Sequence, residues 1–171
     1  RGKTGTTIKL ALDDGPFPAA GERYKDNTCF VYVPHHYRML SDNKIDAVLH
    51  FHGHSNTAEG AMTTYKLREQ LADSKQNAIL IVPQGPVKSK DSSGGKLEKK
   101  GALNTFLREV RQLVQTNEVA AKLGKASIPK SARVGMLCVS AHSGGYHVAA
   151  KVCQHGGFDV REVYLFDALY G

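Results

Sequence analysis

The sequence has few cysteines, no long apolar run and no leader-like segment at its first residues. Cys29, Cys138 and Cys153 are its only cysteines, too few for a disulfide framework, and we interpret them as small core residues. No apolar run approaches the roughly 20 residues that a membrane span requires. The chain begins Arg-Gly-Lys without a charged and then apolar leader, which leaves its compartment open.

The 171 residues are enough for one domain with a proper core. Their net charge of +7 raises the question of nucleic-acid binding, but the basic residues are spread along the chain. The densest basic cluster lies in a polar loop at 87–100 and consists of Lys88, Lys90, Lys96, Lys99 and Lys100. The same loop also holds Asp91 and Glu98. We therefore interpret the cluster as a solvated loop and expect no nucleic-acid partner. A functional loop would favour anionic ligands.

Apolar runs and helical spacings alternate along the chain after an irregular N-terminal segment at 1–28, in which 8–12 is a candidate edge strand. Strands are predicted at 29–33, 45–51, 78–82, 134–140 and 160–166. Helices are predicted at 57–71, at 102–123 with Gly124 as the cap, and from the residues after Ser143 to 155. This order predicts an α/β fold, a three-layer sandwich with a mostly parallel sheet and helices on both faces.

A serine stands at the corner between a predicted strand and a predicted helix. The turn reads Ala141, His142, Ser143, Gly144 and Gly145, which matches the nucleophile-elbow pattern G-x-S-x-G with alanine in the first position. The pattern needs small residues there because strand and helix approach each other closely. The motif therefore indicates a nucleophilic serine, although a serine at such a corner can also be a helix N-cap.

Together with this turn, His52-Gly53-His54 after one strand and Asp167 after the last one resemble the α/β-hydrolase fold over roughly residues 29–171. The resemblance implies a serine that attacks a carbonyl carbon, a histidine that takes its proton and an acid that orients the histidine. It implies Ser143 and Asp167 as catalytic residues. The backbone N–H groups of His54 and Gly144 would form the oxyanion hole.

The largest departure from that family concerns the general base. The family carries this histidine in a loop after the last strand, but no histidine follows His155 in this sequence. We expect the chain to be C-terminally incomplete after residue 171, with the histidine on a C-terminal remainder or a second chain. Among the histidines present, His54 is the one that could face the site, whereas His147 is expected in the packing below the turn. A non-catalytic relative that keeps the fold for binding is the third explanation.

Some of these residues have simpler interpretations. His52 can be a hydrogen-bonded turn residue, and Asp167 can cap a turn. The alternation of His50, His52 and His54 allows a zinc site, but the apolar setting of His50 and the turn at Gly53 argue against it, so no metal or cofactor is expected.

The sequence thus predicts a serine hydrolase that cleaves a carboxylic ester, or less readily an amide, through an acyl-enzyme at Ser143. Its substrate would be a small-molecule or polymer ester, whose identity lies beyond the sequence. The alternative from another class is an inactive α/β-hydrolase-like module that binds anionic polymers or cell-surface ligands through the basic loop.

Overall fold

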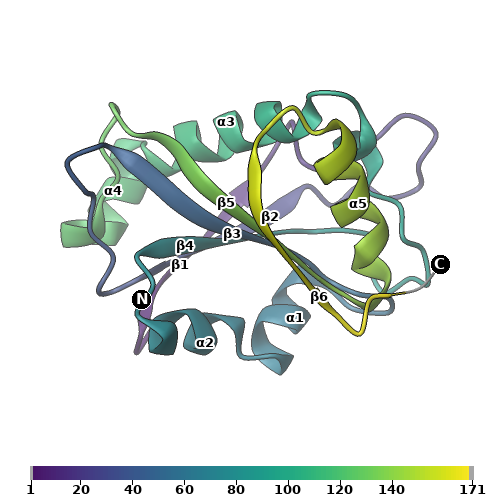
Figure 1. Cartoon of the computed structure of the whole chain (residues 1–171), viewed down its shortest axis with the longest axis horizontal. Helices are drawn as coiled ribbons and strands as arrows, with labels where there is room; N and C mark the ends of the chain where they lie inside the picture. The colour runs from purple at the N-terminus through teal and green to yellow at the C-terminus, as the bar shows by residue number, and fades with distance from the viewer. Residues whose placement is uncertain (1, 170–171) are drawn as a thin grey trace.

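The computed structural model describes residues 2–169, which form three layers with a six-stranded sheet in the middle (Figure 1). On one face lie α1 (Ala58–Thr64) and α2 (Leu67–Ser74). On the other face lie α3 (Ala102–Val114), α4 (Asn117–Leu123) and α5 (Tyr146–His155). The predicted three-layer α/β fold is confirmed.

The strand order in the sheet is β1-β2-β4-β3-β5-β6. The strands are β1 (Gly5–Ala11), β2 (Thr28–Pro34), β3 (Lys44–Phe51), β4 (Ala78–Pro83), β5 (Arg133–His142) and β6 (Val160–Phe166). The pairs β3–β4, β3–β5 and β5–β6 are parallel, whereas β1–β2 and β2–β4 are antiparallel. Parallel neighbouring strands must be joined by a crossover connection, which is usually a helix. The first helices of the chain follow β3, so the parallel part of the sheet begins with β3.

The predicted helix at 57–71 is two helices, because the chain turns at Lys66, whose φ is +51°. Thr57 caps the first of them by accepting a hydrogen bond from the Gly60 N–H at 3.0 Å. The apolar residues at 57–71 have mixed spacings and do not form one stripe. Each short helix therefore buries its own apolar residues against β2 and β4, among them Met62 of α1 and Leu71 of α2.

The predicted helix at 102–123 is also divided, into α3 and α4. Thr116 begins the second helix and accepts a hydrogen bond from the Val119 N–H at 3.4 Å. A threonine in this position competes with helix continuation because its side chain satisfies a free N–H at a new helix start. Gly124 ends α4 with a φ of +61°, so the predicted cap is confirmed.

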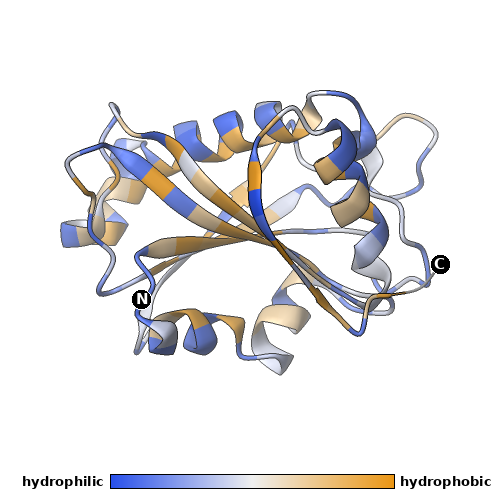
Figure 2. Cartoon of the chain, in the orientation of Figure 1, coloured by the Kyte–Doolittle hydropathy of each residue, from blue (hydrophilic) through white to orange (hydrophobic). Residues whose placement is uncertain are grey.

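The main core lies between the sheet and α3 and α5, and an apolar stripe of α3 is buried in it: Leu103, Phe106, Leu107, Val110 and Val114. Leu113 of the same helix is partly buried against this core. Figure 2 shows the central strands as mostly apolar and α3 with alternating polar and apolar positions. β6 is different, because its apolar residues are exposed: Val163 by 49%, Tyr164 by 51%, Leu165 by 41% and Phe166 by 54%.

The cysteines do not share one environment. Cys29 is fully buried, as predicted, but Cys138 is half-buried and Cys153 is exposed. The core interpretation is wrong for Cys153, because this residue lies on the outer side of α5. No disulfide joins cysteines within residues 2–169. None of the described helices is long and apolar enough to cross a membrane.

Candidate active site

Ser143 occupies a sharp turn between β5 and α5. A single 3-10 turn, Ser143–Gly145, separates the strand from the helix. The φ of Ser143 is +49°, in the left-handed region that costs a non-glycine residue about 1–2 kcal/mol. The N-cap of α5 is Gly145, so the alternative interpretation of Ser143 as the cap of this helix is wrong.

Glycines let the turn pack against the end of β3. A Cβ on Gly145 would lie 2.6 Å from the Phe51 carbonyl oxygen and 2.9 Å from that of His52. A Cβ on Gly53 would lie 2.9 Å from the His142 carbonyl oxygen and 2.9 Å from the Ser143 Cβ. Backbone atoms cannot yield as a flexible side chain can, so these two positions require glycine. The glycine at the last position of the motif is thus explained by close backbone approach.

His52 is a structural residue with a fixed tautomer. Its Nε2 accepts hydrogen bonds from the Gly85 N–H at 3.0 Å and from Gln84 Nε2 at 2.9 Å. Its Nδ1 must then carry the proton, which it donates to the Gly53 carbonyl at 2.9 Å. Burial lowers the pKa of His52, so the ring is neutral and ties the end of β3 to the loop after β4. This agrees with its interpretation as a hydrogen-bonded turn residue.

His54 and Gly144 lie against each other. The His54 imidazole occupies the space over the Gly144 Cα, where a Cβ would overlap its Cδ2 and Nε2 atoms. His54 Nε2 lies 2.7 Å from Ser92 Oγ. The backbone N–H groups of His54 and Gly144 donate no hydrogen bond to residues 2–169. The segment after β3 and the segment after β5 therefore pack together beside Ser143, and each contributes an N–H group that donates to none of residues 2–169.

Asp167 follows β6 at the same edge of the sheet as Ser143. His142 and Phe166, the residues just before them, are partners in the β5–β6 register. Asp167 is exposed and has a φ of +46°. It forms no hydrogen bond or ion pair with the part of the chain that the structure describes. The fold thus brings the two strand ends side by side, and the catalytic role of Asp167 stays a prediction.

None of the described histidines donates to or accepts from Ser143. The His142 ring packs on Tyr65, with centroids 4.7 Å apart and Nδ1 3.4 Å from the Tyr65 hydroxyl. His147 Nε2 lies 3.5 Å from Glu98 Oε1 in a half-exposed position, so its expected place in the packing below the turn is wrong. Residues four apart on a helix share a face, but α5 begins only at Tyr146, after the 3-10 turn, so this spacing does not hold from Ser143.

His50 is buried on the other face of the sheet from α3 and α5. Its Nδ1 lies 2.8 Å from Ser140 Oγ of the neighbouring β5, and its Nε2 has no partner among the described residues. Burial, and then the nearby His52 and His142, lowers the pKa of His50 to about 4. Among residues 2–169, no three His, Cys, Asp or Glu side chains are grouped as metal ligands, and His50, His52 and His54 bind separate partners.

The loop after β4 is fastened to the segment after β3, which the sequence did not predict. Ser55 N–H donates to the Ser89 carbonyl at 2.7 Å, and Lys88 N–H donates to the Asn56 carbonyl at 2.9 Å. The composition of 87–100 predicted only a solvated polar loop. Backbone hydrogen bonds between two irregular segments leave no periodic pattern in a sequence, so only the structure identifies them.

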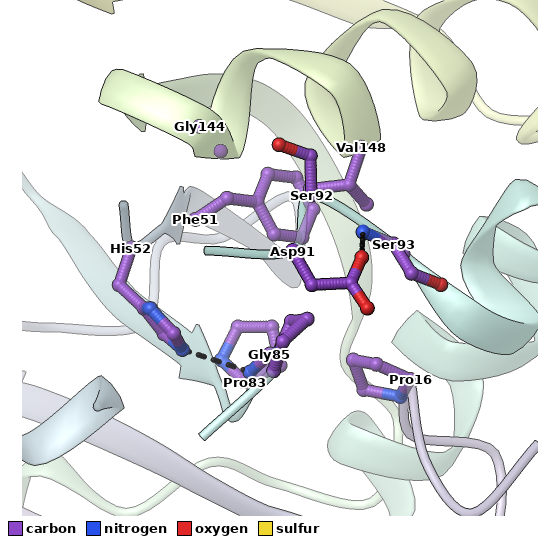
Figure 3. A pocket seen from close by; sticks show the side chains of 13 residues that line it. Pro16, Phe51, His52, Pro83, Gly85, Asp91, Ser92, Ser93, Gly144 and Val148 are labelled. Atoms are coloured by element: carbon purple, nitrogen blue, oxygen red, sulfur yellow. Dashed lines mark hydrogen bonds between the residues drawn. The ribbon is translucent and has the colours of Figure 1, made fainter. Parts of the chain in front are cut away.

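A small cavity separates this loop from the serine turn. Its volume is about 20 Å³, enough for one water molecule. Figure 3 shows Asp91 and Ser92 on one side of it, His52 and Gly85 on another, and Gly144 next to them. The hydrogen bond from the Ser93 N–H lowers the pKa of Asp91, followed by bonding to Tyr24 and by the charges of Arg23 and His54. An ionised carboxylate thus lies close to the His54 ring.

No family model matches the sequence, and no curated protein matches it. Similar solved structures include an acetyl xylan esterase from Aspergillus awamori, at 18% identity and a TM-score of 0.46, covering 86% of this chain and 46% of that one. A mutant feruloyl esterase module from Clostridium thermocellum has 13% identity and a TM-score of 0.43, with 87% and 49% covered. The chain therefore spans about half the length of these two esterases.

The fluorophosphonate-binding serine hydrolase FphF of Staphylococcus aureus has 11% identity and a TM-score of 0.34, with 98% of this chain and 93% of that chain covered. Identities and TM-scores this low do not assign an activity to this chain. The chain itself has an α/β fold with a mostly parallel six-stranded sheet and helices on both faces.

Proposed function

We propose that the protein is a serine hydrolase that cleaves a carboxylic ester, or less readily an amide, through an acyl-enzyme at Ser143. The observation that carries this proposal is the strained turn, in which Ser143 has a φ of +49° and Gly53 and Gly145 admit no Cβ. Strain of this kind persists only where the surroundings enforce it, and it presents a serine hydroxyl at the end of a strand.

The N–H groups of His54 and Gly144 act as the oxyanion hole in this mechanism. As Ser143 Oγ bonds to the carbonyl carbon, negative charge develops on the carbonyl oxygen. Preorganised N–H donors stabilise that charge by about 3–4 kcal/mol each. Neither N–H group has an acceptor among residues 2–169, which supports this role. Asp167 is proposed to orient the histidine that serves as base, in keeping with its position beside the serine turn.

The base itself is proposed to be a histidine from a polypeptide segment other than residues 1–171. The support for this is that every described histidine near the turn has another partner or packs elsewhere. Hydrolases that lose a triad member keep a residual acceleration of about 10³–10⁴ from the oxyanion hole and binding. We therefore expect the chain to react slowly at Ser143.

Labelling with a fluorophosphonate, followed by peptide mass spectrometry, tests the proposal. We expect the label on Ser143, and none on a Ser143→Ala variant with an unchanged circular dichroism spectrum. Ser92 is the informative competitor, because its hydroxyl is 2.7 Å from a histidine nitrogen whereas that of Ser143 has no histidine partner. A label on Ser92, or none on the folded protein, would contradict the assignment of Ser143.

Imidazole provides a test of the missing base. Added imidazole should accelerate the labelling of Ser143 because it can accept the serine proton in solution. The background reaction is measured with the Ser143→Ala variant, since imidazole also attacks activated acyl and phosphoryl groups. A rate that is already fast and does not respond to imidazole would indicate that the chain contains its own base.

The basic loop offers weaker support for the alternative function as a binding module. Lys96 Nζ donates to the Asp13 carbonyl at 2.6 Å, so this amine is engaged within the protein. Lys99 and Lys100 are exposed. Loss of binding to an anionic polymer on neutralising these three lysines, with no reaction at Ser143 in any form of the protein, would favour the alternative.

A further inference from the structure

Three segments that are distant in the sequence meet at the His54 side chain. His54 follows β3, Gly144 follows β5 and Ser92 belongs to the loop after β4. The imidazole covers the Gly144 Cα on one side and is bound to Ser92 Oγ at 2.7 Å through Nε2. His54 is otherwise exposed, so this hydrogen bond and the contact with Gly144 are what fix the ring.

Ser92 lies between two residues that are themselves anchored by hydrogen bonds. The Ser93 N–H donates to Asp91 Oδ1 at 2.8 Å, and Asp91 Oδ2 accepts from the Tyr24 hydroxyl at 2.8 Å. The Ser93 hydroxyl donates to Glu22 at 2.6 Å. The residues on both sides of Ser92 are thus anchored to the N-terminal segment. Ser92 and Gly144 both line the small cavity drawn in Figure 3.

The His54 backbone needs such support because the following residue is strained. Ser55 has a φ of +56°, an unfavourable value for a serine. Its N–H is bound to the Ser89 carbonyl at 2.7 Å, which fixes the chain after His54. The bond between His54 Nε2 and Ser92 fixes the same residue through its side chain. The two bonds therefore hold both the chain after His54 and the His54 side chain.

We propose that Ser92 is a positioning residue of the Ser143 site, which holds the His54 imidazole over Gly144 and thereby aims the His54 N–H at the developing oxyanion. This inference rests on the proposed function. It deepens that function by giving the loop after β4 a part in transition-state stabilisation. Ser92 acts through His54 and does not contact the reacting atoms.

The expected effect is on the rate of the chemical step. A donor that is misdirected stabilises the transition state less but contributes little to ground-state binding. Removing an oxyanion donor outright costs about 10²–10³ in rate, so loosening one should cost about tenfold. For fluorophosphonate labelling of Ser143, we expect Ser92→Ala to lower kinact about tenfold and to leave KI unchanged.

The matched control is Ser89→Ala in the same loop. The Ser89 hydroxyl bonds to the Tyr24 hydroxyl at 2.9 Å and to Arg23 at 3.1 Å, and it does not reach His54. The Ser89 carbonyl that accepts from the Ser55 N–H belongs to the backbone and is kept in the alanine variant. This variant should label like the wild type. Ser92→Thr keeps the hydroxyl and should restore most of the rate. His54→Ala should lose as much as Ser92→Ala, and the double variant should lose no more, because the two residues act as a unit.

Failure of this inference is distinguishable from failure of the proposed function. If the wild-type protein does not label at Ser143, the proposed function fails and the inference fails with it. If the wild type labels but Ser92→Ala has the same kinact as Ser89→Ala, the inference alone is overturned. A change in KI without a change in kinact also overturns it. Thermal unfolding of each variant separates a loss of rate from a loss of folded protein.

Discussion

β5 and β6 are neighbouring parallel strands of similar apolar composition, but they differ in what covers them. Val139 of β5 and Val163 of β6 are partners in the register. The first is fully buried, whereas the second is 49% exposed. β5 has β3 on one side and β6 on the other, with α5 packed on its face. β6 has one strand neighbour in the described sheet, and its side chains are exposed on both faces.

The turns that follow β5 and β6 also differ in how closely other residues pack around them. Ser143 and Asp167 both have a positive φ, of +49° and +46°. The Ser143 turn is enclosed by Gly53 and Gly145, which pack on backbone and Cβ atoms. Asp167 has no hydrogen bond or ion pair with residues 2–169. The same backbone conformation is thus enforced by packing in one turn and left without side-chain support in the other. Enforced strain is the better indicator of a functional residue.

The largest effect is expected from filling the space in the Ser143 turn. Gly145→Ala would place a Cβ 2.6 Å from the Phe51 carbonyl oxygen, so the turn must shift away from β3. We expect a loss of about 3 kcal/mol in the free energy of unfolding, measured in urea, together with loss of labelling at Ser143. Gly2→Ala is the control, because its Cβ would meet the Gly5 carbonyl oxygen at an ordinary 3.5 Å. Equal stability of the two variants would refute the packing argument.

Acid should weaken the attachment of β5 to β3. The pKa of His50 falls from 6.5 to about 4 on folding, mainly through burial, so the unfolded chain binds the proton more tightly. Stability is therefore unaffected by this group above pH 6.5 and declines as the pH falls toward 4. The decline amounts to about 3 kcal/mol between pH 7 and pH 4.

Urea unfolding at pH 7, 5 and 4 measures this decline, and His50→Leu is the comparison. The variant should be less stable at pH 7, because Ser140 loses its partner, but its stability should fall less on acidification. Identical pH slopes for the two proteins would show that His50 does not carry the effect.

The register partners Val139 and Val163 permit the same substitution on both strands. Val139→Thr places a hydroxyl in the core without a partner and should cost about 1–3 kcal/mol in the free energy of unfolding. Val163→Thr should change it by less than about 0.5 kcal/mol, because the side chain is half exposed. Thermal or urea unfolding of both variants provides the measurement. Comparable losses would mean that β6 is covered in solution.

The smallest effect is expected at the turn after β6. Asp167→Gly removes the strain of a positive φ and should stabilise the protein by up to about 1 kcal/mol. The greater freedom of glycine in the unfolded chain reduces this gain. Asp167→Asn, which tolerates the same conformation, should be close to neutral. A destabilisation by Asp167→Gly would indicate that the carboxylate has a partner in the folded protein.

Much of the fold could be predicted from local pattern. The apolar runs of β2, β3, β4 and β6 coincide closely with the predicted strands. For β3 and β4 the reason is that buried parallel strands are nearly continuous in apolar residues. The helix breaks at Lys66 and Thr116 were missed. The mixed apolar spacings at 57–71 and the capping side chain of Thr116 are local signals of these breaks, but an amphipathic pattern averaged over a long window does not reveal them.

The features of the candidate site can likewise be separated into those that are local in the sequence and those that depend on tertiary contacts. The sequence alone determined that a serine stands between a strand and a helix, flanked by residues small enough for a close turn, because both features are local. Only the tertiary structure decided that His52 is a neutral structural residue, that Ser92 binds His54, and that Ser143 lacks a histidine partner among the described residues. Those facts depend on contacts between loops after different strands, and strand pairing brings these loops together without leaving a periodic pattern in any of them.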